Sequence, residues 1–263
     1  MSNEKLINVA NDTMDISNTG EYVFNNKLIK LKKSKSGILY PELYFNKKSI
    51  KPNRNVKKNP TFIVENKPVV DRILACTNNN ICVLNFASAT RPGGGFLNGA
   101  MAQEESMAYC SDLYNTLYDT RLYVLNKTST SIYYTDNMLL SEVTFFKNSD
   151  FQLIQNPKTV KVITSPAVNM NKIPNNNIEI TKANVIMKNR MRKILELAVD
   201  TKCKTLILGA FGCGVFGNKC EDISKYWNEL LIDENFQIYF DIIYFTIYDK
   251  NSENLKPFEK YFK

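Results

Sequence analysis

The stretch from Ile81 to Glu105 reads ICVLNFASATRPGGGFLNGAMAQEE and decides the fold. It begins with a short apolar run, residues 81–86, that we predict to be a buried strand, and it continues through three consecutive glycines into a helix-like stretch. The stretch from Thr205 to Asn218, TLILGAFGCGVFGN, has the same order of an apolar run followed by glycines. Eight of the ten glycines lie in these two loops. Ligands of open α/β sheets bind beyond the carboxyl ends of strands, where both loops begin.

The rest of the chain also alternates strand-like runs with helix-like stretches. Such alternation indicates βαβ units, and therefore an α/β fold whose mostly parallel sheet is covered on both faces. We divide the chain into an N-terminal helical and basic extension, residues 1–60, and a main domain, residues 61–263. The predicted helices are 4–16, 68–77, 103–117, 183–201, 223–231 and, as a helix or turn, 258–262. The predicted strands are 38–45, 61–65, 81–86, 153–155, 160–164, 205–208 and one or two within 236–247.

Composition limits the classes of protein to which the chain can belong. A chain of 263 residues with 44% hydrophobic residues can bury the core of one large domain. No apolar run approaches the roughly 18 residues of a membrane span. The first residues, MSNEKLIN, lack the apolar core of a signal peptide. We therefore expect no membrane partner and an intracellular protein, cytoplasmic or nuclear, that acts as a monomer.

The chain contains no histidine. This excludes Ser-His and Cys-His nucleophilic sites and histidine-ligated metals. The six cysteines have no C-x-x-C spacing, which argues against a zinc site and for reduced thiols. Acid–base chemistry near neutral pH then falls to another side chain, and a carboxyl group is the leading candidate.

The net charge of +8 is concentrated in the segment Lys27–Lys58. This segment contains eleven Lys or Arg and a single acid, Glu42, so it carries +10 while the remainder is near −2. A solvated basic face explains such a run, and so does a surface that attracts a polyanion. Binding of RNA or DNA is a further hypothesis, although the segment lacks the interleaved aromatic residues of an RNA-binding sheet.

The first glycine loop matches neither a Walker A loop nor a G-x-G-x-x-G fingerprint. Glycine permits positive φ and a close approach of backbone to ligand. We therefore interpret both loops as clusters of backbone amides that bind an anion, namely a diphosphate held from two sides. The alternative interpretation of the first loop is a sharp turn that binds no ligand. Glu104 and Glu105 follow at the expected start of a helix, where acids favour the helix dipole.

Residues 84–95, LNFASATRPGGG, followed by seven residues and then Gln-Glu-Glu at 103–105, resemble the signature of microbial-type poly(ADP-ribose) glycohydrolases. The loop at 209–218 is similar to the second, diphosphate-side loop of that family. The resemblance covers residues from about 5 to 260. Phe211 stands where the family commonly has a tryptophan, and we expect it to keep an aromatic wall.

The resemblance implies a macrodomain-like, three-layer α/β/α fold with a mixed sheet, an N-terminal extension and a catalytic domain that binds ADP-ribose. It implies hydrolysis of the ribose–ribose bonds of poly(ADP-ribose), free or on ADP-ribosylated proteins, with Glu105 as general acid/base and Glu104 orienting the ribose. The residues implied to bind substrate are Asn85, Gly93, Gly94, Gly95, Gln103, Gly212, Cys213, Gly214, Val215 and Phe216. Tyr248, near the end of the last strand, is our own expectation for adenine stacking.

Cleavage of a glycosidic bond requires a proton on the leaving oxygen. Ordinary glycosidases place two carboxyl groups across the sugar, about 5 to 9.5 Å apart, and adjacent glutamates usually point in different directions. One carboxyl group that acts first as acid and then as base fits better. Because loop amides offset the charge of a diphosphate, we expect no catalytic metal and no cofactor. Two alternatives stay open: a reader that binds ADP-ribose without hydrolysis, and a hydrolase of a mono-ADP-ribosyl linkage.

Overall fold

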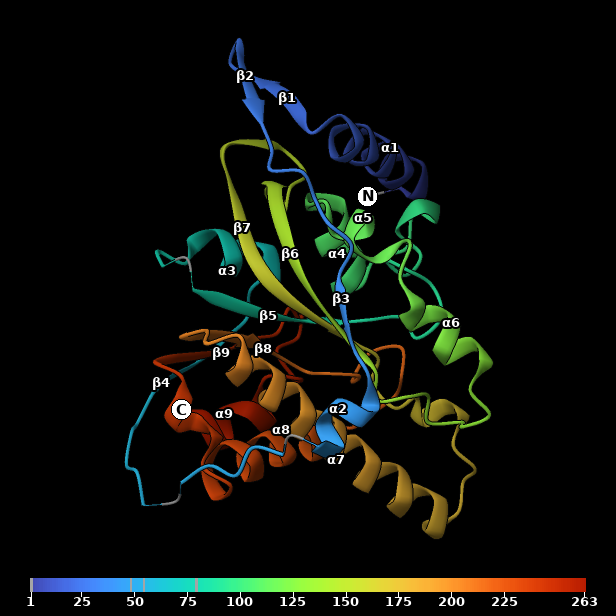
Figure 1. Cartoon of the computed structure of the whole chain (residues 1–263), viewed down its shortest axis with the longest axis vertical. Helices are drawn as coiled ribbons and strands as arrows, with labels where there is room; N and C mark the ends of the chain where they lie inside the picture. Colours follow the sequence, from blue (N-terminus) through green and yellow to red (C-terminus); the bar gives the residue numbers. More distant parts are fainter. Residues whose placement is uncertain (1, 48, 54, 79) are drawn as a thin grey trace.

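A mixed β-sheet forms the centre of the molecule in the computed structural model, which describes residues 2–47, 49–53, 55–78 and 80–263 (Figure 1). The strands of this sheet are β3 (Ile38–Tyr40), β4 (Thr61–Glu65), β5 (Ile81–Phe86), β6 (Met138–Lys147), β7 (Leu153–Ser165), β8 (Thr205–Leu208) and β9 (Ile242–Thr246). Their order is β3-β6-β7-β5-β8-β9-β4. β6 pairs antiparallel with β3 and β7, and all other neighbours are parallel.

Helices cover both faces of the sheet and give the molecule three layers (Figure 1). They are α1 (Asn3–Thr19), α2 (Glu42–Lys47), α3 (Val69–Ala75), α4 (Gln103–Cys110), α5 (Leu113–Leu117), α6 (Arg121–Thr128), α7 (Asn177–Asp200), α8 (Cys220–Asn228) and α9 (Lys256–Phe262). α1, α3, α4, α5 and α6 share one core with the sheet, and α2, α7, α8 and α9 share the other. The predicted three-layer α/β/α fold with a mixed, mostly parallel sheet is confirmed.

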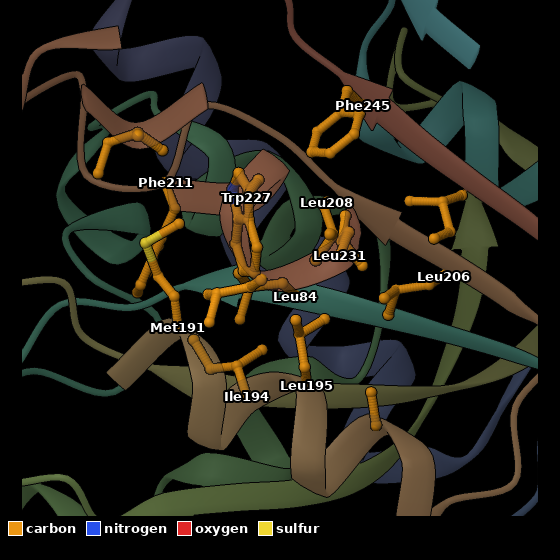
Figure 2. Close-up of a cluster of buried hydrophobic side chains, with 14 of the residues drawn as sticks. Leu84, Met191, Ile194, Leu195, Leu206, Leu208, Phe211, Trp227, Leu231 and Phe245 are labelled. Atoms are coloured by element: carbon orange, nitrogen blue, oxygen red, sulfur yellow. The ribbon is translucent and has the colours of Figure 1, made fainter. Parts of the chain in front are cut away.

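The apolar run of β5 serves both cores. Ile81 and Val83 lie in the core on the α4 side, whereas Cys82 and Leu84 lie in the core on the α7 side. Successive side chains of a strand point to opposite faces, so a strand covered on both faces needs an uninterrupted apolar run. Figure 2 shows the α7-side core, in which side chains of β5 and β8 meet those of α7 and α8, namely Leu84, Leu206, Leu208, Met191, Ile194, Leu195 and Trp227.

Several predicted elements coincide with the observed ones. The strands predicted at 61–65, 81–86 and 205–208 are β4, β5 and β8. The helix predicted at 183–201 is α7, which begins six residues earlier because the side chain of Asn176 accepts a hydrogen bond from the backbone N–H of Glu179 at 2.9 Å. Such a cap satisfies one of the unpaired amides at a helix start.

Other predictions of secondary structure were wrong in part. The strand expected at 38–45 ends at residue 40, and α2 follows it. The helix expected at 103–117 breaks between α4 and α5, because Ser111 is extended and Asp112 accepts a hydrogen bond from the N–H of Thr144 in β6 at 2.7 Å. The two strands expected within 153–164 are one strand, β7, and residues 236–239 form a 3-10 turn before β9. β6 and α6 were not predicted.

The N-terminal residues pack against the rest of the chain. Leu6 and Ala10 of α1 are buried in the α4-side core, and β3 extends the edge of the sheet. Between them lies a hairpin of β1 (Glu21–Phe24) and β2 (Lys27–Lys30). The division of the chain at residue 60 stays a prediction. Within the described residues, no helix has the length and apolar character needed to cross a membrane.

Candidate active site

Gln103, the first residue of α4, joins this helix to the carboxyl end of β5. Its side-chain amide donates to the carbonyl oxygen of Leu84 at 2.8 Å and accepts from the N–H of Phe86 at 2.9 Å. The side chain therefore pairs with the end of β5 as a neighbouring strand would. This contact fixes where the two following glutamates lie, and a contact of Gln103 with substrate stays a prediction.

Glu104 is buried at the end of β5, with only 2% of its surface exposed. Its carboxyl oxygens accept hydrogen bonds from the backbone N–H of Ser88 at 2.7 Å and from the side-chain amide of Asn85 at 3.2 Å. Burial outweighs these bonds and raises the pKa of Glu104 to about 8. Near neutral pH the carboxyl group of Glu104 therefore carries a proton.

Asn85 lies beneath Glu104 and is fully buried. Its amide nitrogen also donates to Thr164 Oγ1 at 3.3 Å, which is the neighbouring position of β7 in the sheet register. No hydrogen-bond partner of Asn85 Oδ1 is found within the described part of the chain. In this arrangement Asn85 positions Glu104, and a contact with ribose stays a prediction.

Glu105 lies nearer the surface, with 8% of its surface exposed, and its carboxylate is held by two backbone amides. Oε1 accepts from the N–H of Gly95 at 2.9 Å, and Oε2 accepts from the N–H of Ala102 at 3.0 Å. The second bond is half of a capping box, since Ala102 has no side-chain oxygen to complete it. Glu105 thus caps the start of α4 and also contacts the glycine loop.

Gly94 fits between the two carboxyl groups. Its φ is +64°, and a Cβ atom there would collide with Oε1 of Glu105 and lie 3.1 Å from Oε2 of Glu104. A side chain at this position is excluded both by the backbone conformation and by the space. Gly93 and Gly94 have positive φ, and a Cβ atom on Gly95 would lie 2.8 Å from the Cβ atom of Ala100, so each of the three positions favours glycine.

The spacer between the glycines and α4 is held from two sides. The hydroxyl group of Tyr109 lies 2.8 Å from the carbonyl oxygens of both Phe96 and Ala100. On the other side α1 packs against the spacer, and a Cβ atom on Gly99 would lie 2.9 Å from the carbonyl oxygen of Asn3. The N-terminal helix thus supports the loop whose Gly95 amide holds the carboxyl group of Glu105.

The second glycine loop follows β8, the strand next to β5 in the sheet. The side-chain amide of Asn218 donates to the carbonyl oxygens of Val168 at 2.8 Å and Gly212 at 3.1 Å, which closes the loop onto the end of β7. Gly212 has a φ of +78°, whereas a Cβ atom on Gly214 would meet no atom within 4 Å. Val215 is 76% exposed, so the tip of the loop is open to solvent.

Phe211 does not form a wall of the site, and that expectation was wrong. Its side chain is fully buried and packs against Phe86, with ring centroids 5.5 Å apart. The loop turns immediately after β8, so residue 211 points into the core and its neighbours point outward. The aromatic residue at the loop surface is instead Phe216, which is half-buried and lies 6.4 Å from the ring of Tyr134.

Two further predicted residues lie near this loop and the last strand. The hydrogen bond with Cys220 raises the pKa of the Cys213 thiol far above its ordinary value, so Cys213 is not a reactive thiolate. Tyr248 follows β9 and is 68% exposed, and its stacking on adenine stays a prediction. Phe245 is fully buried against Phe258 and Phe262, so its ring belongs to the core.

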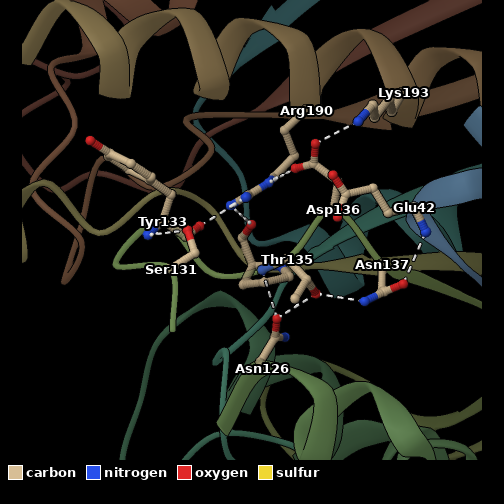
Figure 3. A network of polar contacts seen from close by, with 10 residues as sticks. Glu42, Asn126, Ser131, Tyr133, Thr135, Asp136, Asn137, Arg190 and Lys193 are labelled. Carbon is tan, nitrogen blue, oxygen red and sulfur yellow. Dashed lines mark hydrogen bonds and ion pairs between the residues drawn. The ribbon is translucent and has the colours of Figure 1, made fainter. Parts of the chain in front are cut away.

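Tyr134 lies beside Phe216 of the second glycine loop, a contact that the sequence did not indicate. Figure 3 shows how its segment is fixed: Arg190 extends from α7 to Asp136, at 2.7 Å, and to the carbonyl oxygen of Tyr133, at 2.8 Å. Arg190 is 1% exposed, and its third bond reaches the carbonyl oxygen of Pro166 beyond β7. Arg190 is more than 50 residues from Tyr133 and Asp136 in the sequence. Residues so far apart form no local pattern, so their contact could not be predicted.

The described residues contain no group of three or more His, Cys, Asp or Glu side chains placed to hold a metal ion. Of the predicted residues, the structure brings together Asn85, Gly93, Gly94, Gly95, Gln103, Glu104 and Glu105 at the end of β5, and Gly212, Cys213, Gly214, Val215 and Phe216 after β8. These strands are adjacent in the sheet. Together they define a macrodomain-like α/β protein with two glycine loops at the carboxyl ends of neighbouring strands and a buried pair of glutamates beside the first loop.

Comparison with known proteins gives the particular family. The family model of the microbial-type PARG catalytic domain matches residues 10–148. A poly(ADP-ribose) glycohydrolase from Deinococcus radiodurans, solved in complex with ADP-ribose, is 33% identical, with a TM-score of 0.72 over 78% of this chain and 84% of that one. The chain belongs to the microbial-type poly(ADP-ribose) glycohydrolase family, and the members of this family are glycosidases.

Two structures of the Thermomonospora curvata enzyme agree over nearly the whole chain. The poly(ADP-ribose) glycohydrolase itself is 26% identical, with a TM-score of 0.87 over 98% of this chain and 100% of that one. The same protein bound to the inhibitor ADP-HPD is 25% identical, with a TM-score of 0.85 and coverage of 98% and 99%. No curated protein matches the sequence.

Proposed function

We propose that this protein hydrolyses the ribose–ribose O-glycosidic bonds of poly(ADP-ribose), free or attached to proteins, and releases ADP-ribose. Family membership supports the reaction class. The observation that carries the proposal is the carboxyl group of Glu105, held by the amides of Gly95 and Ala102 beside a glycine loop at the end of a parallel strand.

In the proposed mechanism Glu105 performs both proton transfers. It donates a proton to the oxygen of the leaving ribose as the glycosidic bond breaks. It then takes a proton from the water that attacks the oxocarbenium-like carbon, and so returns to its first state. The two backbone amides hold its carboxyl group in place, which supports a single group working at one position throughout the reaction.

Glu104 orients the ribose in this proposal. Because burial raises the pKa of Glu104 to about 8, its carboxyl group both donates and accepts hydrogen bonds near neutral pH. A ribose hydroxyl group also donates and accepts, so the two are complementary. Glu104 is less exposed than Glu105, which supports a role in positioning rather than in attack from the opposite face of the sugar.

The second glycine loop covers the diphosphate in this proposal. The exposed tip formed by Gly214 and Val215 supports backbone contacts to a phosphate, and Phe216 packs near the distal ribose. Pooled amides offset the negative charge of a diphosphate, so the mechanism needs no metal and no cofactor. The first glycine loop lines the other side of the proposed substrate site with Gly93, Gly94 and Gly95.

The test is incubation of the purified protein with poly(ADP-ribose) and measurement of free ADP-ribose. Release by the wild type supports the proposal, and its absence at high enzyme concentration overturns it. A panel of mono-ADP-ribosyl linkages to amino-acid side chains, run beside the polymer, identifies a hydrolase of those linkages if only they are cleaved. Calorimetric binding of ADP-ribose without release from any substrate identifies a reader.

A further inference from the structure

A groove of about 870 Å³ borders the outer side of the first glycine loop. Its walls come from the C-terminal end of α1, from β2 with the residues that follow it, from α5, and from Leu97 in the spacer of the loop. The groove adjoins a second cavity of about 290 Å³, with which it shares Lys32, Lys33 and Asp112. Both cavities are therefore crossed by the segment between β2 and β3.

Lysines from the end of β2 and from the segment that follows it line the groove and the adjoining cavity. Lys30 lines the groove, Lys35 lines the adjoining cavity, and Lys32 and Lys33 line both; all four are exposed. Lys32 forms an ion pair with Glu142 at 2.7 Å, whereas no ion pair of the other three is found in the described part of the chain. The remaining acids of the lining are Glu21 at the rim and Asp112, which is 3% exposed.

Aromatic side chains connect the groove with the glycine loop. Phe96 of the loop packs against Tyr114 with ring centroids 5.1 Å apart, and Tyr114 packs against Tyr118 at 5.4 Å. Tyr118 is 66% exposed at the groove, and a Cβ atom on Gly93 would lie 3.1 Å from the ring of Tyr114. The row thus leads from the candidate catalytic loop to an exposed ring beside the lysines.

We propose that this groove and the adjoining cavity bind poly(ADP-ribose) outside the catalytic site, with Lys30, Lys33 and Lys35 on diphosphates and Tyr118 against an adenine. The inference rests on the proposed function. A basic groove with an exposed aromatic ring is the general arrangement for a flexible polyanion that carries bases. A single-stranded nucleic acid has similar chemistry, but the shared wall with the glycine loop favours the polymer whose end the loop would hold.

The structure also divides the basic segment Lys27–Lys58 into two parts. Residues 30–36 line the groove beside α1 and the adjoining cavity. In the second half of the segment, Ile50 packs against the α7-side core, and the side chain of Asn235 donates to the carbonyl oxygens of Asn53 and Val56. Lys51 and Lys57, exposed in that half, offer a control of equal charge.

The test compares the double variant Lys33→Gln/Lys35→Gln with the control Lys51→Gln/Lys57→Gln. The substrates are long poly(ADP-ribose) and the ADP-ribose dimer, which has fewer diphosphates outside the site. We expect the KM for the long polymer to rise roughly fivefold to tenfold in the groove variant, with a weaker salt dependence, because two charge contacts are lost. The kcat and the values for the dimer should equal those of the wild type, and the control should match the wild type throughout.

Equal changes for polymer and dimer, no change, or the same effect in the control would overturn the inference. Direct binding of the long polymer is measured in parallel. If the wild type releases no ADP-ribose, the proposed function fails, and the groove is then judged by polymer affinity alone. Single-stranded RNA is tested in the same way. The inference would also be overturned if the RNA binds more tightly than the polymer and the groove variant weakens only the binding of the RNA.

Discussion

The hydroxyl group of Tyr109 lies 2.8 Å from the carbonyl oxygen of Ala100, so α4 holds the spacer of the glycine loop while it also carries Glu105. The backbone of the same helix is tied to α1, because Thr13 Oγ1 donates to the carbonyl oxygen of Tyr109 at 2.7 Å. The loop and the carboxyl group are therefore both held by α4.

Tyr109→Phe removes the hydroxyl group and leaves the carbonyl oxygens of the spacer without this donor. We expect a loss of about 1–3 kcal/mol in the free energy of unfolding and a lower kcat with little change in ADP-ribose affinity. The matched control is Tyr123→Phe, because the buried Tyr123 hydroxyl has no partner within the described residues. Urea unfolding should show the control to be as stable as the wild type or more so. Equal behaviour of the two variants would contradict this role for Tyr109.

Gly94→Ala should abolish most turnover by pushing the carboxyl group of Glu105 out of place. Alanine at positive φ costs about 1–2 kcal/mol, and misplacing a reacting group by about 1 Å costs roughly 100-fold in rate. Gly20→Ala is the control, since Gly20 also has positive φ but no atom within 4 Å of its Cβ position. Both variants should lose stability, and only Gly94→Ala should lose activity. Normal turnover by Gly94→Ala would refute the packing argument.

Much of the fold could be predicted because its signals are local. The strands β4, β5 and β8 are apolar runs bounded by loop residues, and the glycine loops follow two of them directly. The pair Glu104 and Glu105 and their proximity to Gly93–Gly95 also followed from short spacings along the chain. These parts of the site depend on one strand, one loop and one helix.

The parts that could not be predicted depend on contacts between distant residues. The break after α4 is set by Asp112 and Thr144, which are 32 residues apart. β6 lies between β3 and β7, and its polar residues do not alternate regularly, so the sequence shows no strand pattern there. The contacts of Arg190 fix the segment of Tyr134, whose ring lies 6.4 Å from that of Phe216. The burial of Phe211 likewise depends on the direction in which the chain leaves β8.

The ion pair between Asp136 and Arg190 should be important for stability. Although burial opposes it, Arg190 together with Lys193 holds the pKa of Asp136 below its usual range. Asp136→Asn leaves the buried guanidinium without its counter-charge, for which we expect a loss of about 3–5 kcal/mol. Asp233→Asn, at an exposed position, is the control. Urea denaturation at pH 7 measures both, and a loss no larger than that of the control would contradict the prediction.

Glu104 should make the folded protein less stable as the pH rises. The folded carboxyl group has a pKa of about 8, above the value of 4.5 for a free side chain, so the folded state binds this proton more tightly than the unfolded state. Its contribution to stability is complete below about pH 4.5 and is lost as the pH rises through 8. Asp112, with a pKa raised by burial to about 7, acts in the same direction.

Glu104→Gln isolates the contribution of Glu104, because glutamine resembles the protonated carboxyl group and does not titrate. We expect the variant to gain stability relative to the wild type by a few kcal/mol between pH 5 and pH 9, at about 1.4 kcal/mol for each unit of pKa shift. Urea unfolding at both pH values gives the difference, and a constant difference would show that Glu104 is ionised throughout.

The claim that Glu105 performs the proton transfers is tested most directly by the release of ADP-ribose from poly(ADP-ribose) by Glu105→Gln. Glutamine keeps the size of the side chain and one acceptor oxygen but cannot donate and recover a proton. We predict turnover reduced by at least about 100-fold, ADP-ribose binding retained in calorimetry, and normal turnover by the exposed control Glu253→Gln. Wild-type release of ADP-ribose by Glu105→Gln would contradict the account.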